Sequence, residues 1–245
     1  MPTLLLSSRQ TDDTQKLWRA CISEEWKIER VHGWKVPEIS NKHVAVYGES
    51  LFGKHVAKTL GFTLLEPSID WLPKLPAQYR GRDVRLMTLA EARSVRERNF
   101  FKPADEKCFS PRVYEHGGQL PAEGLLPEEL PVLVQGVVQW TVEYRCFVLN
   151  RRILTASAYW RHDALAKDAE GYWDSPAEEH AAAVQFCESV LRDSTVEIPY
   201  AIVIDVGYIA DQGWAVVEAN AAWASGLYGC DPAQVLKVLL GCVHD

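Results

Sequence analysis

The chain has 245 residues, of which 47% are hydrophobic and 24% charged, and its net charge is −7 at neutral pH. This length is enough to bury a sizeable core, as one large domain or two modest ones. The negative net charge argues against a nucleic-acid surface, which needs clustered lysines and arginines, but it still allows a local basic pocket for a nucleotide.

The N-terminus and the cysteines indicate the compartment. Residues 1–9 hold a brief apolar run without a basic start, which predicts a first strand and not a signal peptide. No apolar stretch is long enough to span a bilayer. The six cysteines show no CxxC spacing, which favours free thiols in a reducing compartment. We therefore expect a cytoplasmic protein without a membrane segment.

The first third of the chain predicts a parallel sheet. Apolar runs at 3–7 and 43–47 flank a helical pattern over 12–24, which is the start of a βαβ unit. Residues 50–60 predict a second helix, ended by Gly61, with a short strand after it. The proline-rich stretch 67–76 is expected to be an irregular connection between two lobes.

Two lysines mark the next segment. A capping box at Thr88 predicts a helix over 88–98, and a strand with two phenylalanines then leads into Lys102. A polar loop brings Lys107 back beside it. Two ammonium groups so close together favour a bound anion. The alternative is an exposed loop in which Asp105 and Glu106 neutralise the lysines.

The middle of the chain predicts paired strands and a capped helix. Residues 131–140 read as one continuous buried strand, and 141–149 alternate so that Glu143 and Arg145 share one face. A turn at 150–151 leads to a returning strand over 153–159. Ser175, as N-cap, predicts a helix to about residue 192.

A hairpin with acidic residues lies near the C-terminus. Two β-branched runs, 201–209 and 214–219, flank a turn signal at 211–213. Asp205 and Glu218 are nearly equidistant from the turn, so they lie opposite one another, and Asn220 points the same way as Glu218. Two carboxylates and an amide oxygen are typical ligands of Mg²⁺ that also binds phosphates. The alternative is a solvated strand face with alternating acids.

The order of these motifs resembles the ATP-grasp family over nearly the whole chain. The resemblance implies an α/β plus α+β fold, in which two α+β lobes clasp ATP after a Rossmann-like domain at residues 1–78. The ATP-grasp domain would occupy 79–245, with a small lobe at about 79–138 and a large lobe at about 139–245. A homodimer is left open.

The resemblance also implies roles for individual residues. Lys102 and Lys107 would contact the ATP phosphates, and Arg145 would reach the transferred phosphate. The adenine would bind the interlobe hinge and the ribose Glu143, while the metal would bind the acidic hairpin. The hinge residues are Gln135, Gly136, Val137 and Val138, and the metal ligands are Asp205, Glu218 and Asn220.

Some positions depart from the family pattern. The usual glycine-rich phosphate loop is replaced by residues 104–110, which contain no glycine. The family's first lysine has no clear counterpart, and Arg82 and Arg85 are both candidates for its place. Residues 223–228 are expected either to line the acceptor end of the cleft or to form only a tight turn into a final helix over 232–240.

The implied activity is an ADP-forming ligase that joins a carboxylate to an amine through an acyl phosphate, with ATP and Mg²⁺. Its substrates would be small molecules or peptides. Metal ions, lysine and arginine around a transferring phosphoryl group neutralise its charge. The alternatives are a small-molecule kinase and a binding module that does not catalyse a reaction, both on the same fold.

Overall fold

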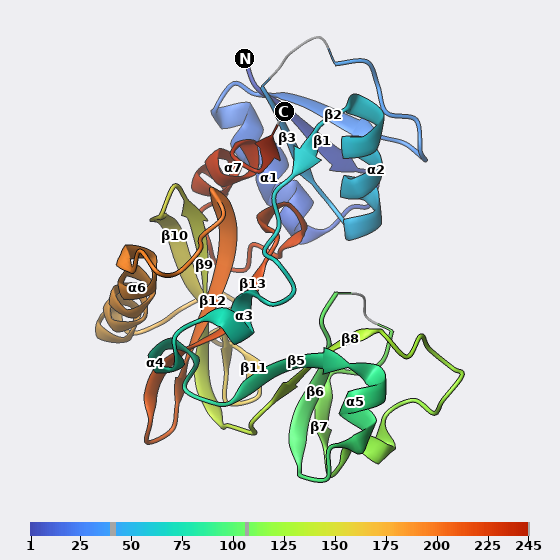
Figure 1. Ribbon diagram of the computed structural model, residues 1–245. Helices are drawn as coiled ribbons and strands as arrows, with labels where there is room; N and C mark the ends of the chain where they lie inside the picture. The colour runs from blue at the N-terminus through green and yellow to red at the C-terminus, as the bar shows by residue number, and fades with distance from the viewer. Residues whose placement is uncertain (40–42, 106–107, 245) are drawn as a thin grey trace.

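The computed structural model describes residues 1–39, 43–105 and 108–244, and its N-terminal part is a parallel sheet between helices. Strands β1 (Thr3–Ser7), β2 (Lys27–Val31) and β3 (Val44–Tyr47) pair in the order β2-β1-β3, with helices α1 (Asp12–Ser23) and α2 (Ser50–Leu60) connecting and covering them (Figure 1). Strand β2 escaped the prediction, because its charged sequence and partial exposure at the sheet edge hide the apolar pattern of a buried strand.

A separate four-stranded antiparallel sheet lies at the opposite end of the molecule. Its order is β5-β8-β6-β7, from strands β5 (Val84–Thr88), β6 (Asn99–Pro103), β7 (Arg112–Tyr114) and β8 (Pro131–Gln135). Helix α5 (Leu89–Ser94) and the 3₁₀ turn η1 (Gly117–Gln119) pack against each other and share its core. The loop between β6 and β7 contains residues 106–107, which lie outside the described residues.

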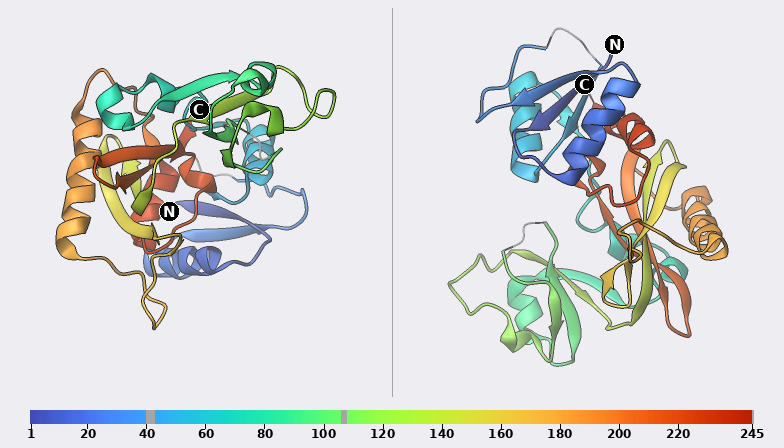
Figure 2. Two further views of the ribbon diagram at one scale, coloured as in Figure 1. Left: turned by 90° about the horizontal axis from the view of Figure 1, so that it is seen from below. Right: turned by 180° about the vertical axis from the view of Figure 1, so that it is seen from behind.

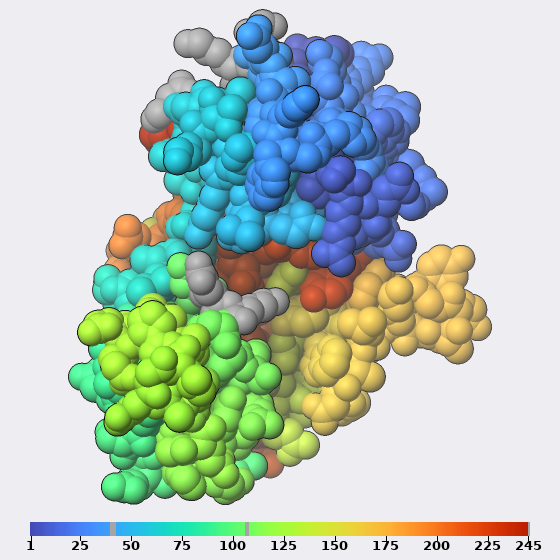
Figure 3. Space-filling model, turned by 90° about the vertical axis from the view of Figure 1, so that its right-hand side faces the viewer, coloured from blue at the N-terminus to red at the C-terminus, as the bar shows by residue number. Residues whose placement is uncertain are grey.

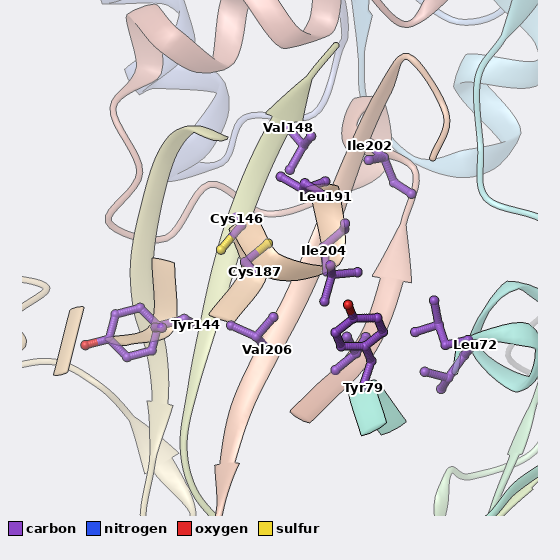
Figure 4. Close-up of a cluster of buried hydrophobic side chains, with 14 of the residues drawn as sticks. Leu72, Tyr79, Tyr144, Cys146, Val148, Cys187, Leu191, Ile202, Ile204 and Val206 are labelled. Carbon is purple, nitrogen blue, oxygen red and sulfur yellow. The ribbon is translucent and has the colours of Figure 1, made fainter. Parts of the chain in front are cut away.

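A five-stranded antiparallel sheet joins these two parts. Its order is β11-β10-β9-β12-β13, from β9 (Trp140–Leu149), β10 (Arg152–Arg161), β11 (Ala164–Leu165), β12 (Ala201–Ile209) and β13 (Gly213–Asn220). Helix α6 (Ala177–Arg192) covers one face. Figure 4 shows Cys146 of β9 and Ile204 of β12 in the same apolar cluster as Cys187 of α6. The predicted alternation along β9 is confirmed, because Tyr144 and Cys146 point into this core while Glu143 and Arg145 line a cavity on the other side.

The C-terminal segment returns to the N-terminal sheet. Helix α7 (Pro232–Leu240) packs against α1 and β3, and strand β14 (Val243–His244) pairs with β4 (Thr63–Leu64) (Figure 2). Side chains from β1, α1, β9, β12 and α7 form one buried cluster. The N-terminal sheet and the five-stranded sheet are therefore joined by a common apolar core.

Four predicted elements differ in extent. The expected strand over 131–140 ends at Gln135, because β8 pairs with the four-stranded sheet and β9 with the five-stranded one, so residues 136–139 must cross between them. Helix α5 ends at Ser94, where Val95 becomes extended and packs on the core of the four-stranded sheet. Helix α6 begins at Ala177 with Pro176 at the N-cap, since the extended ψ of 136° at Pro176 delays the helix. The connection 67–76 contains helix α3 (Trp71–Lys74), and α4 (Ala77–Arg80) follows it.

Candidate active site

A cavity of about 860 Å³ lies where the three sheets meet. Figure 3 shows the hollow between the N-terminal part, in blue, and the four-stranded sheet, in green, with C-terminal residues in red at its floor. The lining combines polar and charged side chains from both antiparallel sheets with the link 136–139 and the segment 224–228. Its charged members include Arg82, Lys102, Asp105, Glu143, Arg145 and Glu218.

The acidic hairpin has the register that the sequence predicts. Asp205 of β12 lies directly opposite Glu218 of β13, and an irregularity in the pairing follows at Val206. The Asn220 side chain donates hydrogen bonds from Nδ2 to Glu218 Oε1 at 2.9 Å and to Asp205 Oδ2 at 3.3 Å. The three side chains therefore meet on one face, as expected, although Asp205 is fully buried and not part of a solvated strand face.

Asp205 is held by Arg145 of the neighbouring strand. Arg145 donates from Nε to Asp205 Oδ1 at 2.9 Å and from Nη2 to Oδ2 at 2.7 Å, and its Nη1 donates to the Gly226 carbonyl at 3.0 Å. The guanidinium also faces the stacked rings of Tyr159 and Tyr228. Burial raises the pKa of Asp205, and the charge and hydrogen bonds of Arg145 act against this rise.

Glu218 is paired with Lys102 from the four-stranded sheet. The Lys102 ammonium lies 2.5 Å from Glu218 Oε2, and the two side chains are 24% and 31% exposed. Burial opposes ionisation of Glu218, but Lys102 and Asn220 outweigh it and hold the pKa below its usual range. This ion pair connects the two antiparallel sheets across the cavity. Lys107, the second lysine of the predicted pair, lies outside the described residues.

Arg82 resolves a choice that the sequence left open. Its guanidinium donates to Gln135 Oε1 from Nε and Nη2, at 3.0 and 2.7 Å, and to the carbonyl groups of Val216 and Val217 on β13. It also lies over the ring of Trp140. Burial lowers the pKa of Arg82 to about 10. Arg85 instead forms an exposed ion pair 3.0 Å from Asp83 and does not line the cavity. Of the two arginines, Arg82 is the one positioned at the cavity.

Comparison with known families decides what kind of fold this is. A family model described as an ATP-grasp domain, the second family of its clade, matches residues 79–238. The chain belongs to this ATP-grasp family. No curated protein matches the sequence.

Solved ATP-grasp structures share the fold at low sequence identity. A RimK domain protein ATP-grasp from Sphaerobacter thermophilus is 12% identical with a TM-score of 0.58, covering 98% of this chain and 100% of that one. D-cycloserine synthetase DcsG is 13% identical with a TM-score of 0.54, at 97% and 98% coverage. The ATP-grasp ligase PsnB, complexed with a minimal precursor, is 12% identical with a TM-score of 0.51, at 98% and 99% coverage. These similarities support the ATP-grasp fold with mixed α and β content.

The ATP-grasp hinge corresponds in position to the link between the two antiparallel sheets. Gln135 ends β8, and Gly136, Val137 and Val138 follow it along the cavity wall. The Gly136 N–H donates to the Asp83 carbonyl at 2.9 Å, and the Gln135 side chain is occupied by Arg82. This link is the covalent connection over which the two sheets face each other. Its contact with adenine stays a prediction.

Glu143 is the acid expected to bind ribose. It lies on β9 two residues before Arg145, lines the cavity and accepts a hydrogen bond from the Tyr159 hydroxyl. Burial raises the pKa of Glu143 to about 7, and the Tyr159 hydrogen bond limits this rise. The carboxyl group therefore changes charge near neutral pH. Tyr159 was missed in the sequence, where its place on a predicted strand was the only signal.

The segment 223–228 satisfies both expectations. Residues 222–224 form the 3₁₀ turn η2 (Ala222–Ala224), and Trp223 is buried in a position where a side chain on Gly53 would collide with it. Ser225, Gly226 and Tyr228 line the cavity. The segment is thus a turn whose outer residues form one wall of the cavity.

The residues of the acidic hairpin fit a divalent cation that binds together with phosphate. Within the described residues no group of three or more His, Cys, Asp or Glu side chains gathers as a metal site. The hairpin offers two carboxylates and the Asn220 amide, and both carboxylates are already paired with cations. Oxygens of ATP could complete the coordination, as is usual for Mg²⁺, while drawing Lys102 and Arg145 toward the phosphates.

Proposed function

We propose that this chain is an ATP- and Mg²⁺-dependent ligase that joins a carboxylate to an amine. The observation that carries the proposal is the convergence of Lys102, Arg145, Asp205, Glu218 and Asn220 on one wall of a cavity between two sheets. Cations for phosphate and oxygen donors for a metal are the groups that phosphoryl transfer requires. The likeness to ATP-grasp structures, including ones described as ligases, supports the same class.

In the proposed reaction, an oxygen of the carboxylate attacks the γ-phosphorus of ATP and ADP leaves. The amine nitrogen then attacks the acyl carbon, phosphate leaves and an amide forms. The first step needs no general base, because a carboxylate is ionised at neutral pH. Lys102 and Arg145 would neutralise the transferring phosphoryl group. Bound Mg²⁺, held by Asp205, Glu218 and Asn220, would supply electrostatic stabilisation of phosphate charge.

The proposal extends to the nucleotide and the domains. Gln135 to Val138 would bind adenine through the backbone, Glu143 the ribose hydroxyls, and Lys107 the phosphates. Residues 1–78 would form a Rossmann-like domain before the ATP-grasp domain of residues 79–245, with its small lobe ending near 138. The parallel order β2-β1-β3 supports the first assignment, and the start of the family match at residue 79 supports the boundary. Among the described residues no helix is long and apolar enough to cross a bilayer.

Paired screening of carboxylates and amines tests the proposal. ADP release should require one of each, and the product should contain a new amide. Hydroxylamine should trap the acyl phosphate as a hydroxamate when the amine is absent, and Arg145→Lys should reduce the yield, because one ammonium cannot replace the two-pronged contact of a guanidinium. A stable phosphorylated product that no amine consumes would make the protein a kinase. Tight ATP binding without turnover would make it a binding module.

A further inference from the structure

A second, smaller pocket lies on the far side of Tyr228 from the main cavity. It has a volume of about 280 Å³ and lies between helix α1 and the segment that follows β11. Its lining is basic and aromatic, in contrast to the negative charge of the whole chain. The lining residues are Asp12, Gln15, Lys16, Arg19, Lys167, Gly171, Tyr172 and Trp173.

The wall from helix α1 is fixed against the main cavity. Lys16 donates from Nζ to the Tyr228 carbonyl at 2.7 Å, and Asp13 accepts from the Leu227 N–H at 3.0 Å. The Tyr47 hydroxyl also donates to Asp13, at 3.3 Å. Helix α1 is therefore tied to the segment whose Gly226 carbonyl accepts from Arg145. A group bound in the second pocket would have a defined position relative to the proposed reaction centre.

The opposite wall is a small antiparallel turn. Lys167 and Trp173 face each other as a bridge, and the Lys167 ammonium lies 4.8 Å from the Trp173 ring centroid. The Trp173 ring meets the edge of Tyr228 at a centroid distance of 5.4 Å. Tyr228 in turn stacks on Tyr159 at 4.8 Å. A row of aromatic rings thus separates the second pocket from the main cavity.

The cations of this pocket lack acidic partners. Within residues 1–39, 43–105 and 108–244, none of Lys16, Arg19 and Lys167 forms an ion pair, and Arg19 makes no hydrogen bond. Asp12 is the single acid in the lining. Like charges gathered around one pocket are unfavourable unless an anion lies among them. A planar guanidinium beside aromatic rings suits the carboxylate of an organic molecule.

We propose that this pocket binds a second carboxylate of the substrate, held by Lys16, Arg19 and Lys167. The inference rests on the proposed ligase function and names its substrate class. The substrate is a molecule with two acidic groups, such as a dicarboxylic amino acid or a peptide with an acidic residue. One carboxylate would react beside Arg145, and the other would bind beyond Tyr228.

Matched substrates that differ only in charge test the proposal. L-glutamate and L-glutamine are compared as the acid component in ADP release, over the same set of amines. We expect kcat/KM for glutamate to exceed that for glutamine by about tenfold or more, as for one charge-assisted contact. Arg19→Gln should move this ratio toward one by raising KM for glutamate. Arg96→Gln, which changes an exposed arginine distant from the pocket in sequence and fold, is the matched control and should leave the ratio unchanged.

A binding experiment separates this proposal from the ligase function. Glutarate and its monoamide are titrated calorimetrically into the wild type and Arg19→Gln, with ADP binding as the check of folding. Glutarate binding that Arg19→Gln weakens would support the pocket even if no pair of substrates releases ADP. ADP release with neutral acids as efficient as with glutamate, and insensitive to Arg19→Gln, would overturn the pocket while leaving the ligase intact. Competition by inorganic phosphate without any binding of glutarate would also overturn it.

Discussion

Replacing Lys102 with methionine should shift metal and nucleotide affinity in opposite directions. The Lys102 ammonium lies 2.5 Å from Glu218 Oε2, so it competes with any cation for that carboxylate. Methionine retains much of the side chain's length and removes the charge. Free Mg²⁺ should therefore bind more tightly to the variant, whereas ATP should lose its proposed phosphate contact.

The magnitude follows from the electrostatics of a partly exposed pair. Unit charges about 4 Å apart interact by about 1 kcal/mol in water and about 4 kcal/mol at an effective dielectric constant of about 20. With side chains 24% and 31% exposed, Lys102 and Glu218 lie between these limits. We expect Mg²⁺ affinity without nucleotide to rise by about tenfold, which corresponds to about 1.4 kcal/mol. ATP affinity should fall by about tenfold or more, and AMP affinity should hardly change.

Titration calorimetry can measure all three affinities on one preparation. Lys27→Met, which breaks an exposed ion pair of 2.9 Å with Glu29 on β2, is the matched control and should change none of them. If Lys102→Met weakens Mg²⁺ and ATP together, the ammonium does not compete with the metal and the reasoning fails. Equal losses for ATP and AMP would mean that Lys102 acts on folding or on the adenosine half.

Three further predictions concern pH, the buried ion pair and the packing of a glycine. Because the pKa of Glu143 is raised to about 7, its charged form grows above that pH, so ADP affinity should rise from pH 6 to 8 while this group's contribution to folding stability falls between pH 4.5 and 7; Glu143→Gln should flatten both profiles in calorimetry and thermal unfolding. Asp205→Asn should lower the free energy of unfolding by about 3 kcal/mol or more, because it leaves the Arg145 charge buried without its partner, whereas Glu218→Gln at a partly exposed site should abolish Mg²⁺-dependent ADP release with a smaller loss of stability; equal stability of the two variants would contradict this. Gly117→Ala should destabilise the fold by about 1–3 kcal/mol in denaturant titration, since an added Cβ would lie 1.8 Å from the Ala92 carbonyl oxygen, while Gly118→Ala, which meets only the His116 side chain at 3.0 Å, should be tolerated better.

The local geometry of the site could be deduced from the sequence because strands impose it. Side chains alternate along a strand, so Glu143 and Arg145 had to share a face, and the turn at 211–213 set Asp205 opposite Glu218. The capping box of Thr88 with Glu91 also formed as predicted, since it depends on residues within one helical turn. These features are short in range, and neighbours in the chain determine them.

Contacts between distant segments were decided only by the tertiary structure. Arg145 pairs with Asp205 because β9 lies beside β12, and Arg82 reaches Gln135 because β5 lies beside β8; neither strand order is encoded by a local pattern. The second pocket likewise needs helix α1 beside residues 167–173. Such neighbours arise when apolar faces of separate elements are buried together, and many strand orders satisfy the same alternation of polar and apolar residues.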